Sequence, residues 1–200
     1  MLTSNKKHIF NLKILSLHNI KFLTSIKLMG YKRLVLQGED SIGQNYVIRE
    51  ADENDILSVM NINRVSLPEN YSYAFFYSIL KSYPKAFLVA EFNGEIAGYI
   101  MSRVEHIFSR FERLRIKRAG HIVSIAVLPP HRRRGLGRAL LLRCLDALKN
   151  IYRCEEAFLE VRVTNKIAIG LYESIGFKIV EVAHGYYIDG EDAYIMAIRL

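Results

Sequence analysis

The 200-residue sequence predicts an α/β domain, α+β in some schemes, in which helices cover both faces of a mixed β-sheet. Three observations support this fold class. Apolar, β-branched runs of strand length recur along the chain, as in residues 121–127. Segments with apolar residues at every third or fourth position lie between these runs. Asn93-Gly94 separates two apolar runs, which is typical of a β-hairpin.

Residues 1–45 are expected to form a basic N-terminal extension, and residues 46–200 the folded domain. The extension carries seven Lys and Arg residues against two acidic residues, and its apolar residues are scattered. It lacks the uninterrupted apolar stretch of a signal peptide. Three interpretations remain open: a helical or flexible arm, a basic arm that touches RNA or the ribosome, or an over-extended start with Met29 or a nearby codon as the true one. Residues 38–45 are interpreted as a linker.

A strand, two helices and a hairpin are expected in the first half of the domain. Asp52 or Asn54 can cap the first helix, because a side-chain oxygen there can accept from an unpaired backbone N–H. Pro68 ends that helix. Residues 105–120 are polar and basic and are interpreted as a variable loop. The expected elements are a strand over 46–49, a helix with Ile56, Val59, Met60 and Ile62 on its apolar face, a helix over 71–83 with Phe75, Ile79 and Leu80 on one face, and a hairpin of 86–91 and 95–104.

The second half is expected to alternate strand and helix. Pro129 and Pro130 stop the strand over 121–127, because proline has no N–H to donate. Asn165 can cap the last helix, and Gly176 ends it. The expected elements are the strand over 121–127, a helix with Leu136, Leu140, Cys144 and Leu148 on its apolar face, a strand over 156–163, a helix with Ile167, Leu171 and Ile175 on one face, and closing strands over 179–183 and 193–200.

An arginine-rich glycine turn, residues 132–137 (RRRGLG), joins the strand over 121–127 to its helix. A helix N-terminus has unpaired N–H groups and partial positive charge, and glycines let an anion approach them. Three arginines add bidentate donors. The pattern therefore indicates a phosphate site, although it is neither a Walker P-loop nor a dinucleotide fingerprint. The alternative is an arginine-rich surface turn that caps an ordinary helix.

Composition excludes several classes of protein. The two cysteines give neither a disulfide framework nor zinc-type spacing, which fits a reducing, cytoplasmic compartment. Cys144 lies on an apolar helix face and is interpreted as a core residue. No apolar run is long enough to span a membrane. The basic extension accounts for most of the net charge of +8, so the charge does not indicate DNA as a partner of the folded domain.

The R-x-x-G-x-G motif resembles the pyrophosphate-binding signature of the GNAT acetyltransferases. Over residues 46–200 the resemblance is to the catalytic subunit of NatA-type N-terminal acetyltransferases, and to archaeal ones most of all. It implies the GNAT fold, acetyl-CoA as co-substrate, protein or peptide N-termini as acceptors, and an auxiliary subunit or the ribosome as candidate partners. Residues 1–45 have no counterpart, and 105–120 are longer and more basic than in that family. The motifs are LPENY, GHIVSIAV, RRRGLG, LEVRVTN, AIGLYESIGF and YYIDGEDAYIM.

The resemblance also implies which residues bind acetyl-CoA. Asn165 would contact the cofactor, although a helix cap is the structural alternative. Tyr172 would lie near the sulfur and protonate the leaving thiolate, although a half-buried core aromatic is the alternative. The main chain of the strand over 121–127 would hold the pantetheine arm and the thioester oxygen of acetyl-CoA. The cofactor-binding set is Ile125, Ala126, Val127, Arg132, Arg133, Arg134, Gly135, Leu136, Gly137, Arg138, Asn165 and Tyr172.

The acceptor is an amine that must be neutral to attack. Roughly 10–20% of an α-amine with a pKa near 8 is neutral at pH 7, against well under 0.1% of a lysine. A modest, water-mediated base therefore suffices, and the candidates are Glu69, and Glu160 with His121. The groove for the substrate's first residues would be lined by Leu67, Pro68, Glu69, Tyr71, Tyr186 and Tyr187.

His121 and Glu160 also have other interpretations. His121 can be a purely structural residue, and Glu160 can pair with Arg162 or Arg118. Together the two could hold a divalent metal, but two ligands make a weak site, so no metal is expected. Two other functions remain as alternatives: a GNAT enzyme that acetylates lysine or small amines, and a non-catalytic module that binds acyl-CoA or the ribosome.

Overall fold

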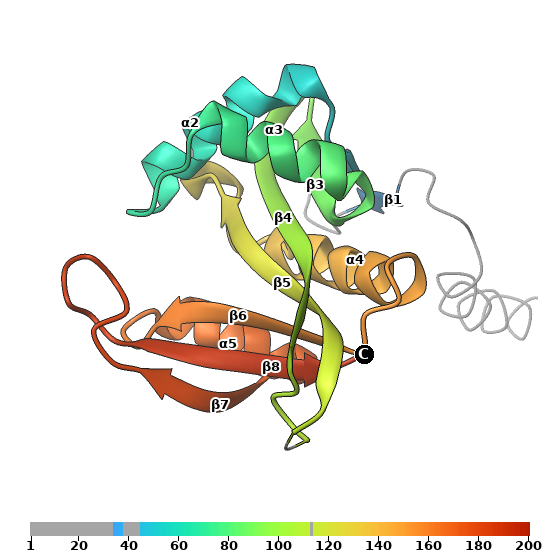
Figure 1. The fold of residues 1–200 in the computed structure, drawn as a ribbon. Helices are drawn as coiled ribbons and strands as arrows, with labels where there is room; N and C mark the ends of the chain where they lie inside the picture. The colour runs from blue at the N-terminus through green and yellow to red at the C-terminus, as the bar shows by residue number, and fades with distance from the viewer. Residues whose placement is uncertain (1–33, 38–44, 113) are drawn as a thin grey trace, which may run out of the picture. The chain divides into compact units, whose positions relative to one another are not determined.

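The computed structural model describes residues 34–37, 45–112 and 114–200. Most of the expected extension, and all of the expected linker except Asn45, lies outside these residues. Figure 1 shows the elements along the chain. They are β1 (Leu34–Gln37), β2 (Asn45–Glu50), α2 (Ile56–Ser66), α3 (Tyr73–Ser82), β3 (Phe87–Phe92), β4 (Glu95–Phe108), β5 (Ile116–Val127), α4 (Leu136–Asn150), β6 (Glu156–Arg162), α5 (Lys166–Ile175), β7 (Lys178–Ala183) and β8 (Ala193–Arg199), with short 3-10 turns at Glu53–Asp55, Pro84–Ala86 and Pro129–His131.

The sheet is mixed, as the sequence predicts, with the strand order β1-β2-β3-β4-β5-β6-β8-β7. The pairs β2–β3, β3–β4, β4–β5, β6–β8 and β7–β8 are antiparallel, whereas β5 and β6 run parallel. The β5–β6 register covers three residue pairs and reaches only His121 opposite Phe158. Beyond this point the two strands diverge, as Figure 1 shows. This divergence in the middle of the sheet positions the site described below.

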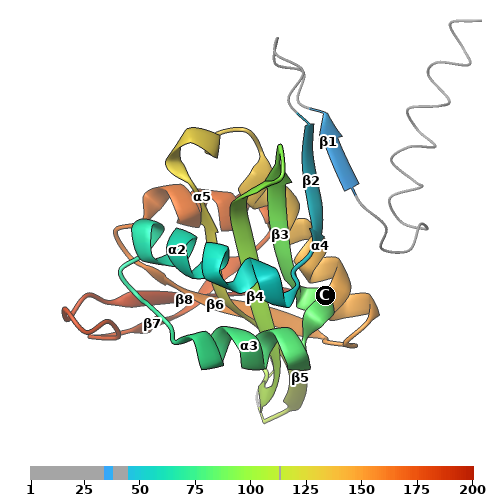
Figure 2. The ribbon, with the colours of Figure 1, turned by 90° about the horizontal axis from the view of Figure 1, so that it is seen from above.

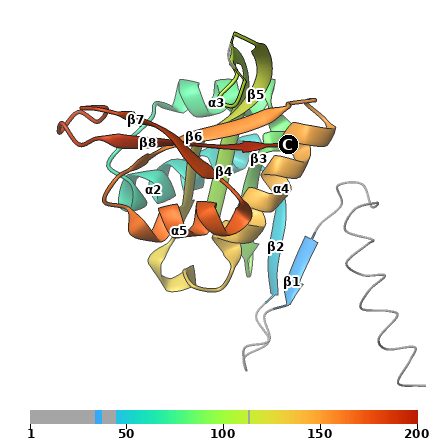
Figure 3. The ribbon, with the colours of Figure 1, turned by 90° about the horizontal axis from the view of Figure 1, so that it is seen from below.

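Helices cover both faces of the sheet, which confirms the predicted fold class. Helices α2 and α3 lie on one face, seen in front in Figure 2, and their Val59 and Phe76 pack in one cluster with Tyr99 of β4. Helices α4 and α5 lie on the other face, seen in front in Figure 3. There Cys144 is fully buried among apolar residues, so its interpretation as a core residue is confirmed. Each face thus has its own apolar core.

Helix α4 lies close against the sheet at Gly120 of β5. A Cβ atom built on Gly120 would lie 2.5 Å from Cδ1 of Leu148, a fully buried residue of α4. Only glycine fits at this position without displacing a core side chain. The contact sets how closely β5 and α4 pack at Gly120, which directly precedes His121 in the strand.

The interpretation of residues 105–120 as a variable loop is wrong. Strand β4 continues to Phe108 and β5 begins at Ile116, with pairs from Glu105–Ala119 to Phe108–Ile116. The side chains of Phe108 and Ile116 at the hairpin end are exposed, so no buried face imposes the apolar alternation that predicts a strand.

Two predicted helix faces are partly wrong. In α3 the buried aromatic is Phe76, whereas the predicted Phe75 is only half-buried. In α5 the buried residues are Ile169 and Tyr172, whereas the predicted Ile167 is 78% exposed. The predicted cap of α5 is present, because Asn165 accepts from the N–H of Ala168. Asp52 accepts from the N–H of Asn54, but it caps the 3-10 turn Glu53–Asp55, and α2 itself follows Asp55 without a side-chain cap.

Candidate active site

A cleft of 810 Å³ lies where β5 and β6 diverge. Its size is that of a small-molecule or cofactor site. One wall is formed by residues 121–125 of β5, and the opposite wall by residues 159–162 of β6. The structure brings many of the predicted site residues to this cleft, namely Leu67, Pro68, Glu69, Tyr71, His121, Ile125, Glu160, Asn165, Tyr172, Tyr186 and Tyr187.

The β5 wall offers main-chain groups to the cleft. Ile125, Ala126 and Val127 pair with β4 on one side. On the other side the β5–β6 register ends at His121, so this part of β5 has no ladder to β6. An extended ligand can therefore lie along β5 in the manner of an added strand.

The N-terminus of α4 has the features of an anion site. Its N-cap Gly135 has φ +78° and supplies no side-chain cap, so the first backbone N–H groups of the helix are left for a ligand. Arg132, Arg133 and Arg134 are exposed beside it. Arg132 donates from Nε to the Val127 carbonyl oxygen at 2.8 Å, which ties this turn to the end of β5.

Arg138 lies in the first turn of α4 and contacts α5. Its guanidinium donates to Oγ of Ser174 at 3.0 Å. Arg138 thus joins the two helices on this face of the sheet. Leu136, another residue of the predicted set, is 2% exposed and packs in the core, so only its main chain can reach a ligand.

His121 lies between two carboxylates. Its Nε2 is 2.8 Å from Oε2 of Glu160 and its Nδ1 is 3.0 Å from Oε1 of Glu105. Burial by itself lowers the pKa of His121, but the hydrogen bonds and charges of Glu160 and Glu105 outweigh it and raise the pKa above its usual value. Glu160 therefore contacts His121, and neither Arg162 nor Arg118, the two partners that the sequence left open, takes that place.

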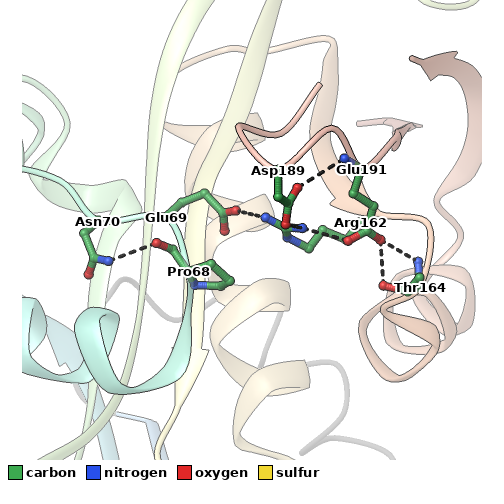
Figure 4. Close-up of polar contacts among 7 residues, drawn as sticks. All are labelled: Pro68, Glu69, Asn70, Arg162, Thr164, Asp189 and Glu191. Atoms are coloured by element: carbon green, nitrogen blue, oxygen red, sulfur yellow. Dashed lines mark hydrogen bonds and ion pairs between the residues drawn. The ribbon is translucent and has the colours of Figure 1, made fainter. Parts of the chain in front are cut away.

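Arg162 has a different role, which Figure 4 shows. Its guanidinium donates to Glu69 at 2.6 Å and to Asp189 and Glu191 at 2.7 Å each. It also stands 3.9 Å from the ring centroid of Tyr187. One side chain at the end of β6 thus holds both the segment before α3 and the β7–β8 loop.

The loops that Arg162 holds carry the predicted tyrosines. Tyr71 stacks on Phe75 with ring centroids 4.9 Å apart, and Tyr186 packs edge-on against Tyr187 at 5.1 Å. Burial, followed by the nearby charges of Glu69 and Glu160, raises the pKa of Tyr71. These rings give the mouth of the cleft an aromatic, amphipathic lining.

Tyr172 is the most buried phenol at the cleft, with 6% of the residue exposed. Burial raises its pKa to about 12, so it keeps its proton at neutral pH. The structure thus places Tyr172 as a core aromatic that also reaches the cleft. Asn165 likewise caps α5 and lines the cleft, so the structural interpretation holds for both positions, and their roles toward a cofactor stay predictions.

The sequence left two of these residues without a role. Glu105 lies in the segment interpreted as a loop, and the sequence suggests Arg162 only as a partner of Glu160. Glu160 and Arg162 lie two apart on one strand, a spacing that places both on the same face, and this was the signal available in the sequence. Among the described residues, no cluster of three or more His, Cys, Asp or Glu side chains is arranged to hold a metal. None of the described helices is long and apolar enough to cross a membrane.

A mixed sheet that opens between two parallel strands, with an uncapped, arginine-flanked helix N-terminus after the first of them, is the arrangement expected of an acyltransferase that uses a nucleotide thioester. Residues 56–177 match the model of the Acetyltransferase (GNAT) family, and the chain belongs to this family. Acetyl-CoA is the acetyl donor in this family.

Individual relatives indicate a narrower class than the family does. An N-alpha-acetyltransferase of Sulfurisphaera tokodaii is 52% identical over 159 residues, which cover 79% of this chain and 95% of the relative. The N-terminal acetyltransferase A complex catalytic subunit NAA10 of Arabidopsis thaliana is 38% identical over 155 residues, 76% of this chain and 77% of that one. The crystal structure of Ard1 from Thermoplasma volcanium has a TM-score of 0.64 at 32% identity and covers 78% of this chain and 97% of that chain.

Proposed function

We infer that this protein transfers the acetyl group of acetyl-CoA to the α-amine of a protein or peptide N-terminus. The observation that carries this inference is the match to an N-alpha-acetyltransferase at 52% identity over 79% of this chain and 95% of the relative. The cleft supports it, because its mouth is bounded by two loops that one arginine, Arg162, holds together. The architecture leaves room for a chain end between them.

Acetyl-CoA would lie along β5 with its pyrophosphate at the N-terminus of α4. Gly135, Leu136 and Gly137 would offer backbone N–H groups, and Arg132 to Arg134 would add positive charge. The main chain of Ile125 to Val127 would hold the pantetheine arm. An N–H group near Val127 would face the thioester oxygen as it gains negative charge. Asn165 and Tyr172 border the same cleft.

The reaction is a direct attack in a ternary complex. The neutral amine attacks the thioester carbon, a C–N bond forms, and the C–S bond breaks. The amine loses one proton to a carboxylate or to water, and the departing thiolate gains one. Tyr172, which keeps its proton at neutral pH, is the candidate donor to sulfur. Both cysteines are buried, so neither is placed as a covalent nucleophile.

Two carboxylates border the cleft as candidate proton acceptors. Glu69 is bound by Arg162, and Glu160 is bound by His121. Both remain candidates here. A modest base suffices for an α-amine, because part of that amine is already neutral at pH 7. The substrate's first residues would contact Leu67, Pro68, Tyr71, Tyr186 and Tyr187.

Partners and compartment follow from the same proposal. A relative is the catalytic subunit of an acetyltransferase complex, so an auxiliary subunit is a candidate partner of this chain. The basic residues 1–45 make the ribosome a second candidate. We propose a cytoplasmic location, where N-termini emerge during synthesis and the two free cysteines stay reduced.

The test is mass spectrometry of peptides incubated with the full chain and acetyl-CoA. One peptide set has free α-amines, and a matched set has blocked α-amines and free lysines. Acetylation confined to free α-amines is expected. Modification of the blocked set at comparable rates would instead indicate a lysine or small-amine acetyltransferase, and binding of acetyl-CoA with no product in either set would indicate a non-catalytic module.

A further inference from the structure

The imidazole of His121 is held at both ring nitrogens by carboxylates. Nδ1 is 3.0 Å from Glu105 and Nε2 is 2.8 Å from Glu160. The ring stacks on Phe158 with centroids 4.5 Å apart, and its side chain is 13% exposed. A neutral imidazole has one N–H and one lone pair, so it can donate to only one of two carboxylates. Two donated hydrogen bonds require the doubly protonated ring.

The second carboxylate, Glu105, is also held by Arg103. The Oε1 atom that faces His121 accepts from Nε of Arg103 as well. A guanidinium at this oxygen stabilises the ionised carboxylate, which has no proton to donate, so the ring donates to it from Nδ1. Burial works to raise the pKa of Glu105, but His121 and Arg103 together lower it, which agrees with a charged Glu105.

The groups around this pair come from several elements. Arg103 and Glu105 belong to β4, and Glu160 belongs to β6. The charges of Glu160 and Arg103 both act on the phenols of Tyr71 and Tyr186, so these phenols lie near His121 and its carboxylates. Glu69 lies near the same tyrosines but is bound by Arg162. None of these neighbours replaces Glu105 at Nδ1.

We propose that Glu105 is a positioning residue that keeps His121 an imidazolium donating from both nitrogens. Both His121 and Glu160 line the cleft, but Glu160, and not the imidazole, then serves as the proton acceptor. This inference rests on the proposed function for its use in turnover. The substrate proton then passes to a carboxylate, directly or through water, while His121 keeps both of its protons throughout the reaction. Glu105 does not line the cleft and acts only through His121.

The first experiment follows the His121 ring by NMR in the full chain, without substrate, in wild type, Glu105→Gln and Glu105→Asp. The ring of the wild type should titrate above its ordinary value, and Glu105→Gln should lower that midpoint by about one pH unit or more, because an opposite charge within 4–6 Å is lost. Glu105→Asp should fall between the two. Glu112→Gln, on the same hairpin but paired with Arg115, is the matched control and should leave the midpoint unchanged. An unchanged midpoint in Glu105→Gln would overturn the proposal.

The second experiment compares kcat/KM for a peptide in Glu105→Gln and wild type over a range of pH. Ionisation of the peptide amine is common to both enzymes and cancels in their ratio. If the imidazolium is required, the ratio of Glu105→Gln to wild type is near one below both His121 midpoints and falls below one, by about tenfold for each pH unit between the midpoints, as the pH rises. If the neutral imidazole is the base, the same ratio lies above one at low pH and falls towards one, and that result, or a ratio that does not change with pH, would overturn the proposal.

The two experiments separate this inference from the proposed function. If N-terminal peptides are not substrates but the ring titrates as expected, the proposed function fails and the charge assignment stands. If peptides are acetylated and the ring of the wild type is neutral at pH 7, the function stands and the role of Glu105 is refuted.

Discussion

Arg162→Lys should separate the role of geometry from that of charge at the mouth of the cleft. The guanidinium of Arg162 donates from one nitrogen to Glu69 and from another to Asp189 and Glu191, all at 2.6–2.7 Å. A lysine keeps the positive charge, but its single ammonium cannot point in both directions. We therefore expect Glu69 and the β7–β8 loop to lose their common anchor.

The magnitude follows from the exposure of the cluster. Arg162 is 16% exposed, whereas the side chains of Glu69 and Asp189 are 36% and 60% exposed. Ion pairs this open to water contribute little, so the free energy of unfolding should change by about 1 kcal/mol or less. Misplacing a group by about 1 Å can cost on the order of a hundredfold in rate. We expect kcat/KM for a peptide to fall by about tenfold to a hundredfold, with KM for acetyl-CoA unchanged.

Steady-state kinetics with peptide and acetyl-CoA varied in turn would measure this effect. Arg115→Lys is the control, because Arg115 pairs with Glu112 at the far end of the β4–β5 hairpin. Adding Glu69→Gln completes a double-mutant cycle, in which the second loss should be smaller in the Arg162→Lys background. Wild-type kinetics in Arg162→Lys, or losses that multiply in full, would refute the idea that Arg162 acts through Glu69.

Three further predictions concern other parts of the domain. Gly120→Ala should destabilise the fold by about 1–3 kcal/mol by overpacking against α4, and this would be measured as a lower thermal midpoint. Gly170→Ala in α5, where a Cβ meets nothing within 4 Å, is the control and should not lower the midpoint. Arg132→Ala with Arg133→Ala should raise KM for acetyl-CoA, and an unchanged value would remove these side chains from the phosphate site. Tyr172→Phe should lower kcat by about 10²-fold at unchanged KM. Because the pKa of Tyr172 is about 12, wild-type activity should not decline through loss of its proton as the pH rises from 7 to 10, and a decline that Tyr172→Phe abolishes would contradict its protonated state.

The sequence predicted those elements in which one signal dominates. Pro129 and Pro130 end β5, Gly176 ends α5 in a left-handed conformation with φ +113°, and Asn165 caps that helix. The sequence did not predict the end of the β4–β5 hairpin, because a two-stranded ribbon with exposed faces shows no apolar alternation. It also failed for the face of α5, because stripes through Ile167 and through Ile169 are both apolar. Only tertiary packing decides between them.

The candidate site divides in the same way. The approach of His121 and Glu160 follows from the register of two parallel strands, and the structure places their side chains 2.8 Å apart. The partners of Arg162 did not follow, because several carboxylates lie within reach of its flexible side chain. Strand spacing fixes which face a residue lies on, but the choice among ion-pair partners depends on loops whose path the sequence leaves open.

The ionisation of the acceptor bears on which amine the cleft can acetylate. Glu69 is bound by Arg162 and Glu160 by His121, so each candidate acceptor already contacts a hydrogen-bonding partner. Removing a proton at pH 7 costs about 1.4 kcal/mol for an α-amine with a pKa near 8, but about 4.6 kcal/mol for a lysine with a pKa near 10.4. The difference of about 3 kcal/mol corresponds to roughly two orders of magnitude in the population of the neutral amine. This difference lies in the two amines themselves, so it favours chain ends over lysines before any contact with the substrate's side chains.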